Sequence, residues 1–306
     1  MNTIGIIGAG SFGTALGKVL QDNGNNILYY VRTPRNIQNS TTSIEQLFIS
    51  CQLILIVIPV ENIPNLLSQI KNFIKPHHYL VHCIKGLITT TEKEVLTVSE
   101  AIKKELKHDH VGCLSGPNLA NEIKNLQLTS AVIASDSQDL TKLVKTVMHN
   151  EKFIVYGSED LIGVELCGVL KNIIALASGI LYGLGEGDNA KSLLMTLGMM
   201  EMLQIAKMLY PNADEKTFYS IAGLGDLIAT CSSTLSRNFL LGSRIAHKEK
   251  LEDICRDGTA EGVKTTLTIY NFAVKNNMTF PITFAVYKIL FEEEDPDFIR
   301  KVLIEN

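Results

Sequence analysis

Short apolar runs alternate with amphipathic stretches along the first half of the chain. Most runs are continuously apolar rather than alternating with polar residues, which is typical of strands buried on both faces of a parallel sheet. These predicted strands cover residues 3–7, 27–31, 53–58, 79–84, 111–114, 130–134 and 153–156. Helical periodicity occupies residues 12–23, 92–106 and 136–148 between them. Because strands and helices alternate, we expect an α/β fold with a doubly wound parallel sheet.

The pattern changes after about Ser158. Strand signals end, and long helical patterns cover residues 161–182, 189–209, 237–246 and 260–275. We therefore expect two domains, an α/β domain over residues 1–157 and an all-α C-terminal domain over residues 158–306.

The composition is that of an ordinary soluble globular protein, since 46% of the 306 residues are apolar and 20% are charged. The net charge is −4, from 28 basic and 32 acidic residues, so the basic surplus typical of nucleic-acid binding is missing. We expect no nucleic-acid partner. An anion site would have to be built from a few local cations and backbone N–H groups.

The sequence predicts neither a signal peptide nor a membrane span. Met1 precedes an apolar run without a basic region, and the most apolar segment, residues 161–182, carries Glu165 and Lys171. A buried helix explains that segment better than a membrane span. Six scattered cysteines, without a C-x-x-C pair, indicate free thiols rather than disulfides or zinc. We expect a cytoplasmic protein without a metal.

A glycine-rich turn follows the first strand and opens the first helix. Gly8, Gly10 and Gly13 form G-x-G-x-x-G, with Ser11 and Phe12 between the last two glycines. Such glycines permit a tight turn, close approach of a pyrophosphate and close packing of helix on strand. The free N–H groups of the helix would bind phosphate. A purely structural glycine turn is the alternative, but the context favours a Rossmann-type dinucleotide site.

The end of the second predicted strand bears on the choice of cofactor. A site that prefers NAD usually has an acidic residue there to bind the ribose 2′-OH. This chain has Arg32 at that place and no acidic residue between Asp22 and Glu45. An arginine suits a 2′-phosphate, so we expect NADPH to be used at least as well as NADH. The alternative is that Arg32 only stacks on the adenine.

Two further segments follow predicted strands, where ligands of open α/β sheets bind. One is Lys85-Gly86, and the other contains Gly116 and Asn118. An exposed loop lysine is the alternative explanation for Lys85.

Lys171 lies in the most apolar helical segment of the chain. Its helical neighbours are small and apolar, so an ammonium there is costly unless it has a partner or a catalytic role. A lysine in a cleft can act as a general acid or base, whereas a lysine that reaches the surface has no such role. Both interpretations remain open, as they do for Asp226, which either caps its helix or holds Lys171.

Ser236, Arg237 and Asn238 stand at the predicted start of a helix. A serine N-cap would leave a guanidinium, an amide and free N–H groups together, which suits a phosphate. An ordinary capped surface helix is the alternative.

Taken together, these motifs resemble the bacterial NAD(P)-dependent sn-glycerol-3-phosphate dehydrogenases. The similar stretches run in the family's order across nearly the whole chain, and several are long and specific. They are GAGSFGTAL (8–16), KGL (85–87), SGPNLANE (115–122), GVELCGVLKNIIALASGI (163–180), GDNAKS (187–192), AGLGDLIATC (222–231), LSRN (235–238), AEGVKT (260–265) and PIT (281–283).

The resemblance implies hydride transfer between NAD(P)H and dihydroxyacetone phosphate, giving sn-glycerol 3-phosphate for phospholipid synthesis. It implies catalytic roles for Lys171, as proton donor and acceptor, and for Lys85 and Asp226. The implied substrate-binding residues are Lys85, Gly116, Asn118, Lys171, Asn172, Asp226, Thr230, Ser236, Arg237 and Asn238. The implied contacts to the dinucleotide are Gly8, Gly10, Ser11, Phe12, Gly13, Arg32, Lys85, Ala120, Arg237, Thr259 and Glu261.

The resemblance further implies NADP or NAD as cofactor, a dinucleotide-binding domain before residue 158, a helical substrate-binding domain after it, and a homodimer. Some positions depart from the family's pattern. Phe12 replaces Trp or Tyr, Asn118 replaces Ser or Thr, and Cys167 replaces Gly. The segment between residues 35 and 53 is much shorter than usual. It lies near the adenosine in this family's fold, so the resemblance implies least about the choice between NAD and NADP.

Two other functions are weighed against this one. A dinucleotide sensor without catalysis would have no need of Lys85 and Lys171 in a cleft. A related dehydrogenase acting on an unphosphorylated 3-hydroxy acid would have no need of a phosphate site at Ser236 and Arg237.

Overall fold

The computed structural model describes residues 3–34, 36–90, 94–255 and 261–305. The chain divides into two compact units. The first holds residues 1–88 and 96–165, and the second holds residues 89–95 and 166–306. Helix α7 (Leu161–Gly183) crosses the division, which lies eight residues after the boundary expected near residue 157.

An eight-stranded sheet organises the first unit, in the order β10-β9-β8-β5-β4-β1-β2-β3. The strands are β1 (Thr3–Ile7), β2 (Asn26–Tyr30), β3 (Ser40–Thr41), β4 (Leu53–Ile56), β5 (Tyr79–His82), β8 (Val111–Ser115), β9 (Thr129–Ser135) and β10 (Phe153–Ser158). Neighbouring strands are parallel except β8 and β9. The expected parallel sheet is therefore confirmed for most of its strands, whereas β9 and β10, parallel to each other, run antiparallel to the rest. A parallel return needs a long crossover, whereas the β8–β9 connection contains only the short helix α5 (Ala120–Lys124), which packs on α1.

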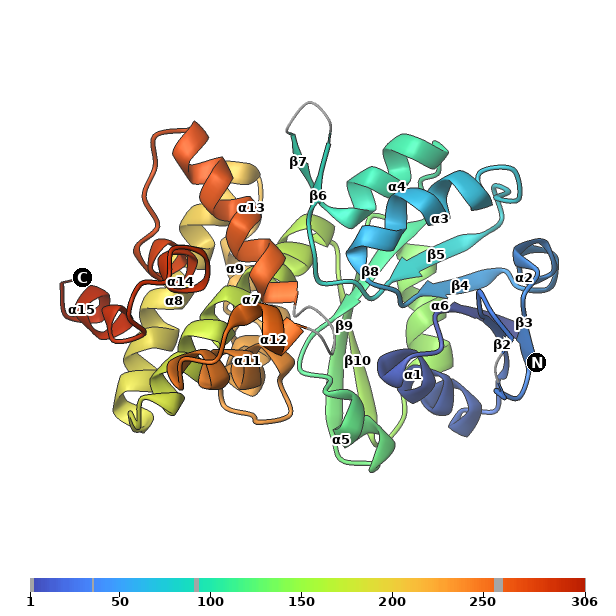
Figure 1. Ribbon diagram of the computed structural model, residues 1–306. Helices are drawn as coiled ribbons and strands as arrows, with labels where there is room; N and C mark the ends of the chain where they lie inside the picture. The colour runs from blue at the N-terminus through green and yellow to red at the C-terminus, as the bar shows by residue number, and fades with distance from the viewer. Residues whose placement is uncertain (1–2, 35, 91–93, 256–260, 306) are drawn as a thin grey trace. The chain divides into compact units, whose positions relative to one another are not determined.

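The sheet has a hydrophobic core on each face, which explains its continuously apolar strands. In β4, Leu53 and Leu55 join one core, whereas Ile54 and Ile56 join the other. Helices α1 (Ser11–Asp22) and α6 (Gln138–Met148) cover the first face, and α2 (Ile44–Ser50), α3 (Ile63–Ile70) and α4 (Val98–Leu106) cover the second (Figure 1). The doubly wound architecture is confirmed.

Helix α4 begins later than the sequence indicates. Residues 92–93 lie outside the described residues, and Val95–Leu96 form strand β7, which pairs with β6 (Ile88–Thr89). Thr97 then starts the helix through a capping box with Glu100. The reciprocal bonds of a capping box satisfy two otherwise unpaired N–H groups, so they fix the helix start better than periodicity does.

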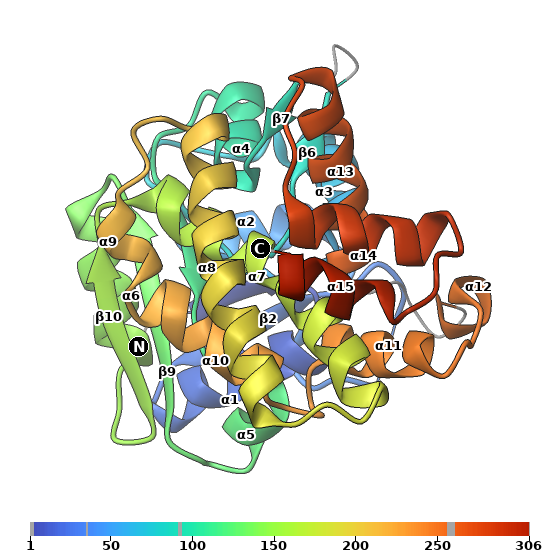
Figure 2. The same cartoon turned by 90° about the vertical axis from the view of Figure 1, so that its left-hand side faces the viewer.

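The second unit consists of helices apart from its share of the β6–β7 hairpin (Figure 2). After α7 come α8 (Asp188–Leu209), α9 (Glu215–Phe218), the π-helical turn η2 (Ile221–Gly225), α10 (Asp226–Cys231), α11 (Arg237–Ala246), α12 (Leu251–Ile254), α13 (Glu261–Lys275), α14 (Pro281–Phe291) and α15 (Phe298–Glu305). Buried Glu201 of α8 accepts hydrogen bonds from the N–H groups of Ile282 and Thr283, at 2.7 and 2.8 Å, and so caps α14.

Helices α7 and α11 approach closely at two glycines. A Cβ on Gly179 would lie 2.0 Å from the carbonyl oxygen of Phe239, and one on Gly242 would lie 2.1 Å from that of Leu176. Neither position can hold a larger residue without separating the helices. This contact sets the distance between the side chains that α7 and α11 carry.

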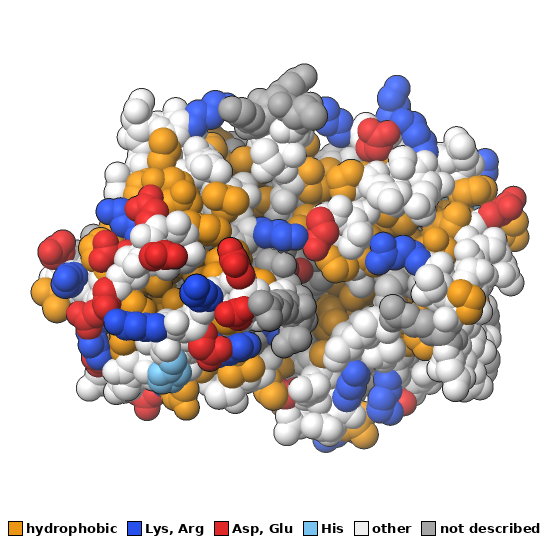
Figure 3. Space-filling model, in the orientation of Figure 1, with side chains coloured by type: hydrophobic (Ala, Val, Ile, Leu, Met, Phe, Trp, Pro, Cys, Tyr) orange, Lys and Arg blue, Asp and Glu red, His pale blue; other side chains and the backbone are white. Residues whose placement is uncertain are grey.

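Helices α7 and α8 are long and apolar enough to cross a membrane, by length and composition alone. In their most apolar windows, 94% of α7 and 39% of α8 is buried. A core helix of a soluble protein passes the same test, so the two helices are weak evidence for a membrane protein. Basic and acidic side chains are interspersed on the face shown in Figure 3. All six cysteines are free, and all but Cys255 are buried.

Buried polar groups tie β5 to α4 and to the first turns of α7. His82 Nε2 lies 3.0 Å from Ser99 Oγ and 3.0 Å from Glu165 Oε1, and the N–H of Ser99 donates to the same carboxylate. Burial opposes a charge on His82, but Cys113 and Glu165 outweigh it and raise the pKa of His82 to about 10. Glu165, which the sequence left without a partner, therefore anchors α7 to the sheet.

Two other buried histidines lie where β5 and β8 begin. His78 Nδ1 accepts the N–H of Lys75 at 2.8 Å, so Nε2 carries the proton donated to the carbonyl oxygen of Phe48. His108 Nε2 donates to the carbonyl oxygen of His78 at 2.8 Å. Burial lowers the pKa of both residues below 6.5. Both are therefore protonated less readily in the folded protein than in the unfolded chain.

We expect acid to destabilise the protein through this pair. Below pH 6.5 the unfolded chain binds protons that folded His78 and His108 do not, so the free energy of unfolding falls as the pH drops. Each histidine contributes at most about 1.4 kcal/mol per pH unit. The raised pKa of His82 adds stability as the pH falls towards 6.5 and little change below it, and this contribution cancels when variants are compared with the wild type.

Urea unfolding at pH 7.5, 6.5 and 5.5 would measure this slope. It should be smaller in His78→Gln and unchanged in His247→Gln, because His247 is exposed and belongs to the second unit. Equal slopes in all three proteins would contradict the assignment.

Candidate active site

The glycine turn joins β1 to α1 with the geometry of a phosphate-binding loop. Gly8 has φ +110°, and a Cβ on Gly13 would lie 2.0 Å from the carbonyl oxygen of Gly8. A Cβ on Gly10, in contrast, meets nothing within 4 Å among the described residues. Gly10 is also the N-cap of α1 and provides no side-chain hydrogen bond. The turn is thus tightly packed at Gly8 and Gly13 and open at Gly10, where the N–H groups of α1 begin.

Other predicted cofactor residues of the first unit lie on or next to elements that adjoin this turn, since α5 packs on α1 and β2 pairs with β1. Phe12 and Ala120 pack against the edge of the core, half-buried. Arg32 is exposed just after β2. The open space at Gly10 and the free end of α1 fit the pyrophosphate of a dinucleotide. Thr259 lies outside the described residues, and Glu261 is half-buried in the first turn of α13, in the second unit.

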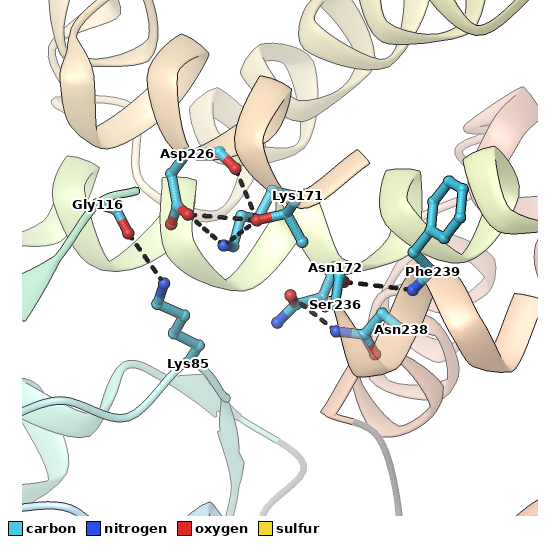
Figure 4. A network of polar contacts seen from close by, with 9 residues as sticks. Lys85, Gly116, Lys171, Asn172, Asp226, Ser236, Asn238 and Phe239 are labelled. Carbon is cyan, nitrogen blue, oxygen red and sulfur yellow. Dashed lines mark hydrogen bonds and ion pairs between the residues drawn. The ribbon is translucent and has the colours of Figure 1, made fainter. Parts of the chain in front are cut away.

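Lys85 and the segment after β8 meet within the first unit. Lys85 Nζ donates to the carbonyl oxygen of Gly116 at 3.4 Å (Figure 4). Gly116 has φ +117°, a conformation that favours glycine. Asn118 Nδ2 and Ser115 Oγ are buried and have no hydrogen-bond partner among the described residues. Buried polar groups are normally paired, so these two atoms are suited to a ligand. Ser115 was not among the predicted site residues.

Lys171 is buried in the second unit, with 3% of its surface exposed. Its ammonium donates to Asp226 Oδ1 and, at 2.5 Å, to Thr230 Oγ1 (Figure 4). Thr230 Oγ1 in turn donates to the carbonyl oxygen of Asp226 at 2.7 Å. The surface-lysine interpretation is therefore wrong, and of the two interpretations of Asp226 the structure supports the one that holds Lys171.

Thiol chemistry does not accompany the two lysines. Burial raises the pKa of Cys231 to about 12, although Lys171 opposes the rise. Burial likewise raises the pKa of Cys83 to about 12 against the influence of Lys85. Both side chains stay protonated at neutral pH and are poor nucleophiles. No group of three or more metal-ligating side chains is found in the described part of the chain.

An amide network joins α7, α11 and α13. Asn238 Nδ2 donates to Asn172 Oδ1 at 2.9 Å, and the N–H of Gly262 donates to Asn238 Oδ1 at 3.0 Å. These bonds fix both amide orientations. Asn172 Nδ2, which is buried, has no partner among the described residues. Asn172 is thus held with a donor available to a ligand.

The start of α11 has the predicted cap. Ser236 is buried and its Oγ accepts the N–H of Phe239 at 3.3 Å, whereas Arg237 is exposed at the first position of the helix. The guanidinium and the helix N-terminus together can attract an anion.

Family models for NAD-dependent glycerol-3-phosphate dehydrogenase match most of the chain. The N-terminal model matches residues 3–46 and 32–141, and the C-terminal model matches residues 160–301. The glycerol-3-phosphate dehydrogenase [NAD(P)+] of Staphylococcus haemolyticus is 35% identical, over 96% of this chain and 95% of that protein. The protein of the same name from Staphylococcus aureus is 35% identical, over 100% and 98%.

A solved structure has the same fold along its whole length. The glycerol-3-phosphate dehydrogenase of Coxiella burnetii superposes with a TM-score of 0.90 at 30% identity, covering 100% of this chain and 99% of that one.

The glycine turn allows a pair of variants to separate binding from folding. In Gly10→Ala the new Cβ has space and φ is −77°, so the variant should fold at least as stably as the wild type. The methyl group would occupy the space in front of the turn, so the Kd for NADH should rise by about 10-fold or more. Gly13→Ala should instead lower the Tm, because its Cβ clashes with backbone. Calorimetric binding and thermal unfolding would measure both effects. A wild-type Kd in Gly10→Ala would place the dinucleotide elsewhere.

Proposed function

The chain belongs to the NAD-dependent glycerol-3-phosphate dehydrogenase family, and we propose that buried Lys171, held by Asp226 and Thr230, is the proton donor and acceptor of its reaction. The protein is an NAD(P)-dependent oxidoreductase that interconverts dihydroxyacetone phosphate and sn-glycerol 3-phosphate. The observation that carries the assignment is the burial of a paired ammonium. An uncompensated lysine at 3% exposure would be very costly, whereas this one has two acceptors on α10, one of them a carboxylate.

The phosphate of the substrate is assigned to α11. Arg237 and the N–H groups at the start of that helix supply positive charge, and Asn172 Nδ2 supplies a fixed donor. Asn238 holds Asn172 through its amide and keeps a second N–H for the phosphate. Gly116 and Asn118 are proposed to contact the remainder of the substrate. Binding the phosphate at one place fixes the carbonyl at another, which is an entropic contribution to the rate.

The protein's side chains are proposed to stabilise negative charge on the substrate oxygen and to transfer its proton. The glycine turn, Arg32, Ala120, Thr259 and Glu261 would hold the dinucleotide, which would provide the hydride donor or acceptor. As the carbonyl is reduced, negative charge develops on its oxygen. Lys171 Nζ gives that oxygen a proton, and Lys85 stabilises the charge before the proton arrives. Asp226 keeps Lys171 in place. In the reverse direction Lys171 takes the proton from the alcohol.

Several broader features follow as proposals. The first unit would bind the dinucleotide, because it carries the glycine turn, and the second unit the phosphorylated substrate. The six free thiols suit a reducing compartment, so we place the enzyme in the cytoplasm. We further propose that it acts as a homodimer and supplies glycerol 3-phosphate for phospholipid synthesis.

Initial rates with dihydroxyacetone phosphate test the catalytic assignment. Lys171→Ala should lower kcat by about 10²- to 10⁴-fold, the usual contribution of a general acid. Because this variant leaves Asp226 buried without its cation, Lys171→Met/Asp226→Asn should be assayed beside it. Lys275→Ala, at an exposed lysine of α13, is the control. Near-normal turnover in both Lys171 variants, with NADPH still bound, would refute the role. Cofactor binding by the wild type without turnover would favour the sensor function.

The same assay with NADPH and NADH tests Arg32. If Arg32 binds the 2′-phosphate, Arg32→Ala should raise the KM for NADPH about 10-fold, the effect of one charge-assisted hydrogen bond. The KM for NADH should change little. An unchanged ratio of the two would mean that Arg32 only stacks on the adenine.

A further inference from the structure

A lysine outside the predicted set points at the glycine turn. Lys124 is the last residue of α5, and its Nζ donates to Ser11 Oγ at 3.1 Å. The two residues are 113 positions apart in sequence. Ser11 is the first residue of α1, so the ammonium lies at the helix end that begins the dinucleotide site.

Packing fixes the backbone of Lys124, whereas its side chain, like that of Ser11, is exposed. Ile123, its neighbour, is 4% exposed and belongs to the same core cluster as Ala15 and Val19 of α1. Helix α5 therefore stays against α1, and Lys124 can reach Ser11 from a rigid base. This packing does not depend on a ligand.

Electrostatics leaves this ammonium without a counter-charge. The N-terminus of a helix carries about half a positive elementary charge, so a cation is disfavoured there and an anion is favoured. The first turn of α1 has no acidic residue. Ser11 Oγ is neutral, and Lys124 forms no ion pair with any carboxylate among the residues that the structure describes. A cation and a helix N-terminus that face the same place are stabilised together by an anion.

We propose that Lys124 binds the pyrophosphate of the dinucleotide together with the first N–H groups of α1. The inference rests on the dinucleotide occupying the glycine turn. An ammonium acts as a point charge rather than as a geometric fork. Since NAD and NADP share the pyrophosphate, Lys124 contributes affinity to both cofactors without choosing between them.

The alternative is structural. Lys124 also stands at the C-terminus of α5, where a cation favours the helix dipole. In that case its loss would lower stability slightly and leave cofactor affinity unchanged. Binding and stability measurements therefore distinguish the two roles.

Calorimetry is the suitable binding measurement, because the chain has no tryptophan to report on binding. Lys124→Ala should raise the Kd for NADPH and for NADH by the same factor, about 10-fold. Its Kd should also respond less to added salt, because a charge contact is missing. Lys124→Arg should restore most of the affinity. The control is Lys142→Ala, at an exposed lysine of α6 in the same unit.

Three outcomes would overturn the proposal. The first is a wild-type Kd in Lys124→Ala with a lowered Tm, which would assign Lys124 to helix α5. The second is a loss confined to NADPH, which would assign it to the 2′-phosphate. The third is failure of the wild type to bind either cofactor, which would overturn the proposed function as well. Equal losses for both cofactors, an unchanged Tm and rescue by arginine would together support it.

Discussion

The structure of the second unit depends on compensating one buried charge. Lys171 stands on the apolar helix α7, and its ammonium is accepted by Asp226 and Thr230, one turn apart on α10. Both acceptors must face α7, so this requirement orients α10 and the π-helical turn before it. Replacing a buried ion pair by apolar residues is often neutral or stabilising. Stability alone therefore does not account for a lysine here, whereas the proposed proton transfer would.

Close packing serves the same site from the other side of α7. The contact at Gly179 and Gly242 brings α11 against α7, so that Asn238 can reach Asn172. The hydrogen bond from the N–H of Gly262 then adds α13 to the network. These are short contacts between packed helices, and a single methyl group would separate them. In the first unit, Glu165 and His82 hold the beginning of α7 in a comparable way.

Most elements could be predicted from the sequence, because continuously apolar strands and helical periodicity are local properties. Strand direction is not local, and nothing in the apolar residues 130–134 indicates that β9 runs against β8. The sequence also placed Lys171 in an apolar helix but could not tell burial from exposure. Burial of Lys171 depends on Asp226, a residue distant in sequence, lying close to it in space. The sequence did not indicate a role for Lys124, because its contact with Ser11 joins residues that are far apart in the chain.

Arg32 and Lys124, both in the first unit, would contribute differently to cofactor binding. Arg32 follows β2, where NAD and NADP differ, so it can change their ratio. Lys124 reaches the start of α1, where the two cofactors are identical, so it can change only their common affinity. In this proposal, cofactor preference and cofactor affinity would be set by residues on separate elements. A contact at the pyrophosphate would add affinity that does not depend on the adenosine. The choice of cofactor could then vary through Arg32 without loss of binding.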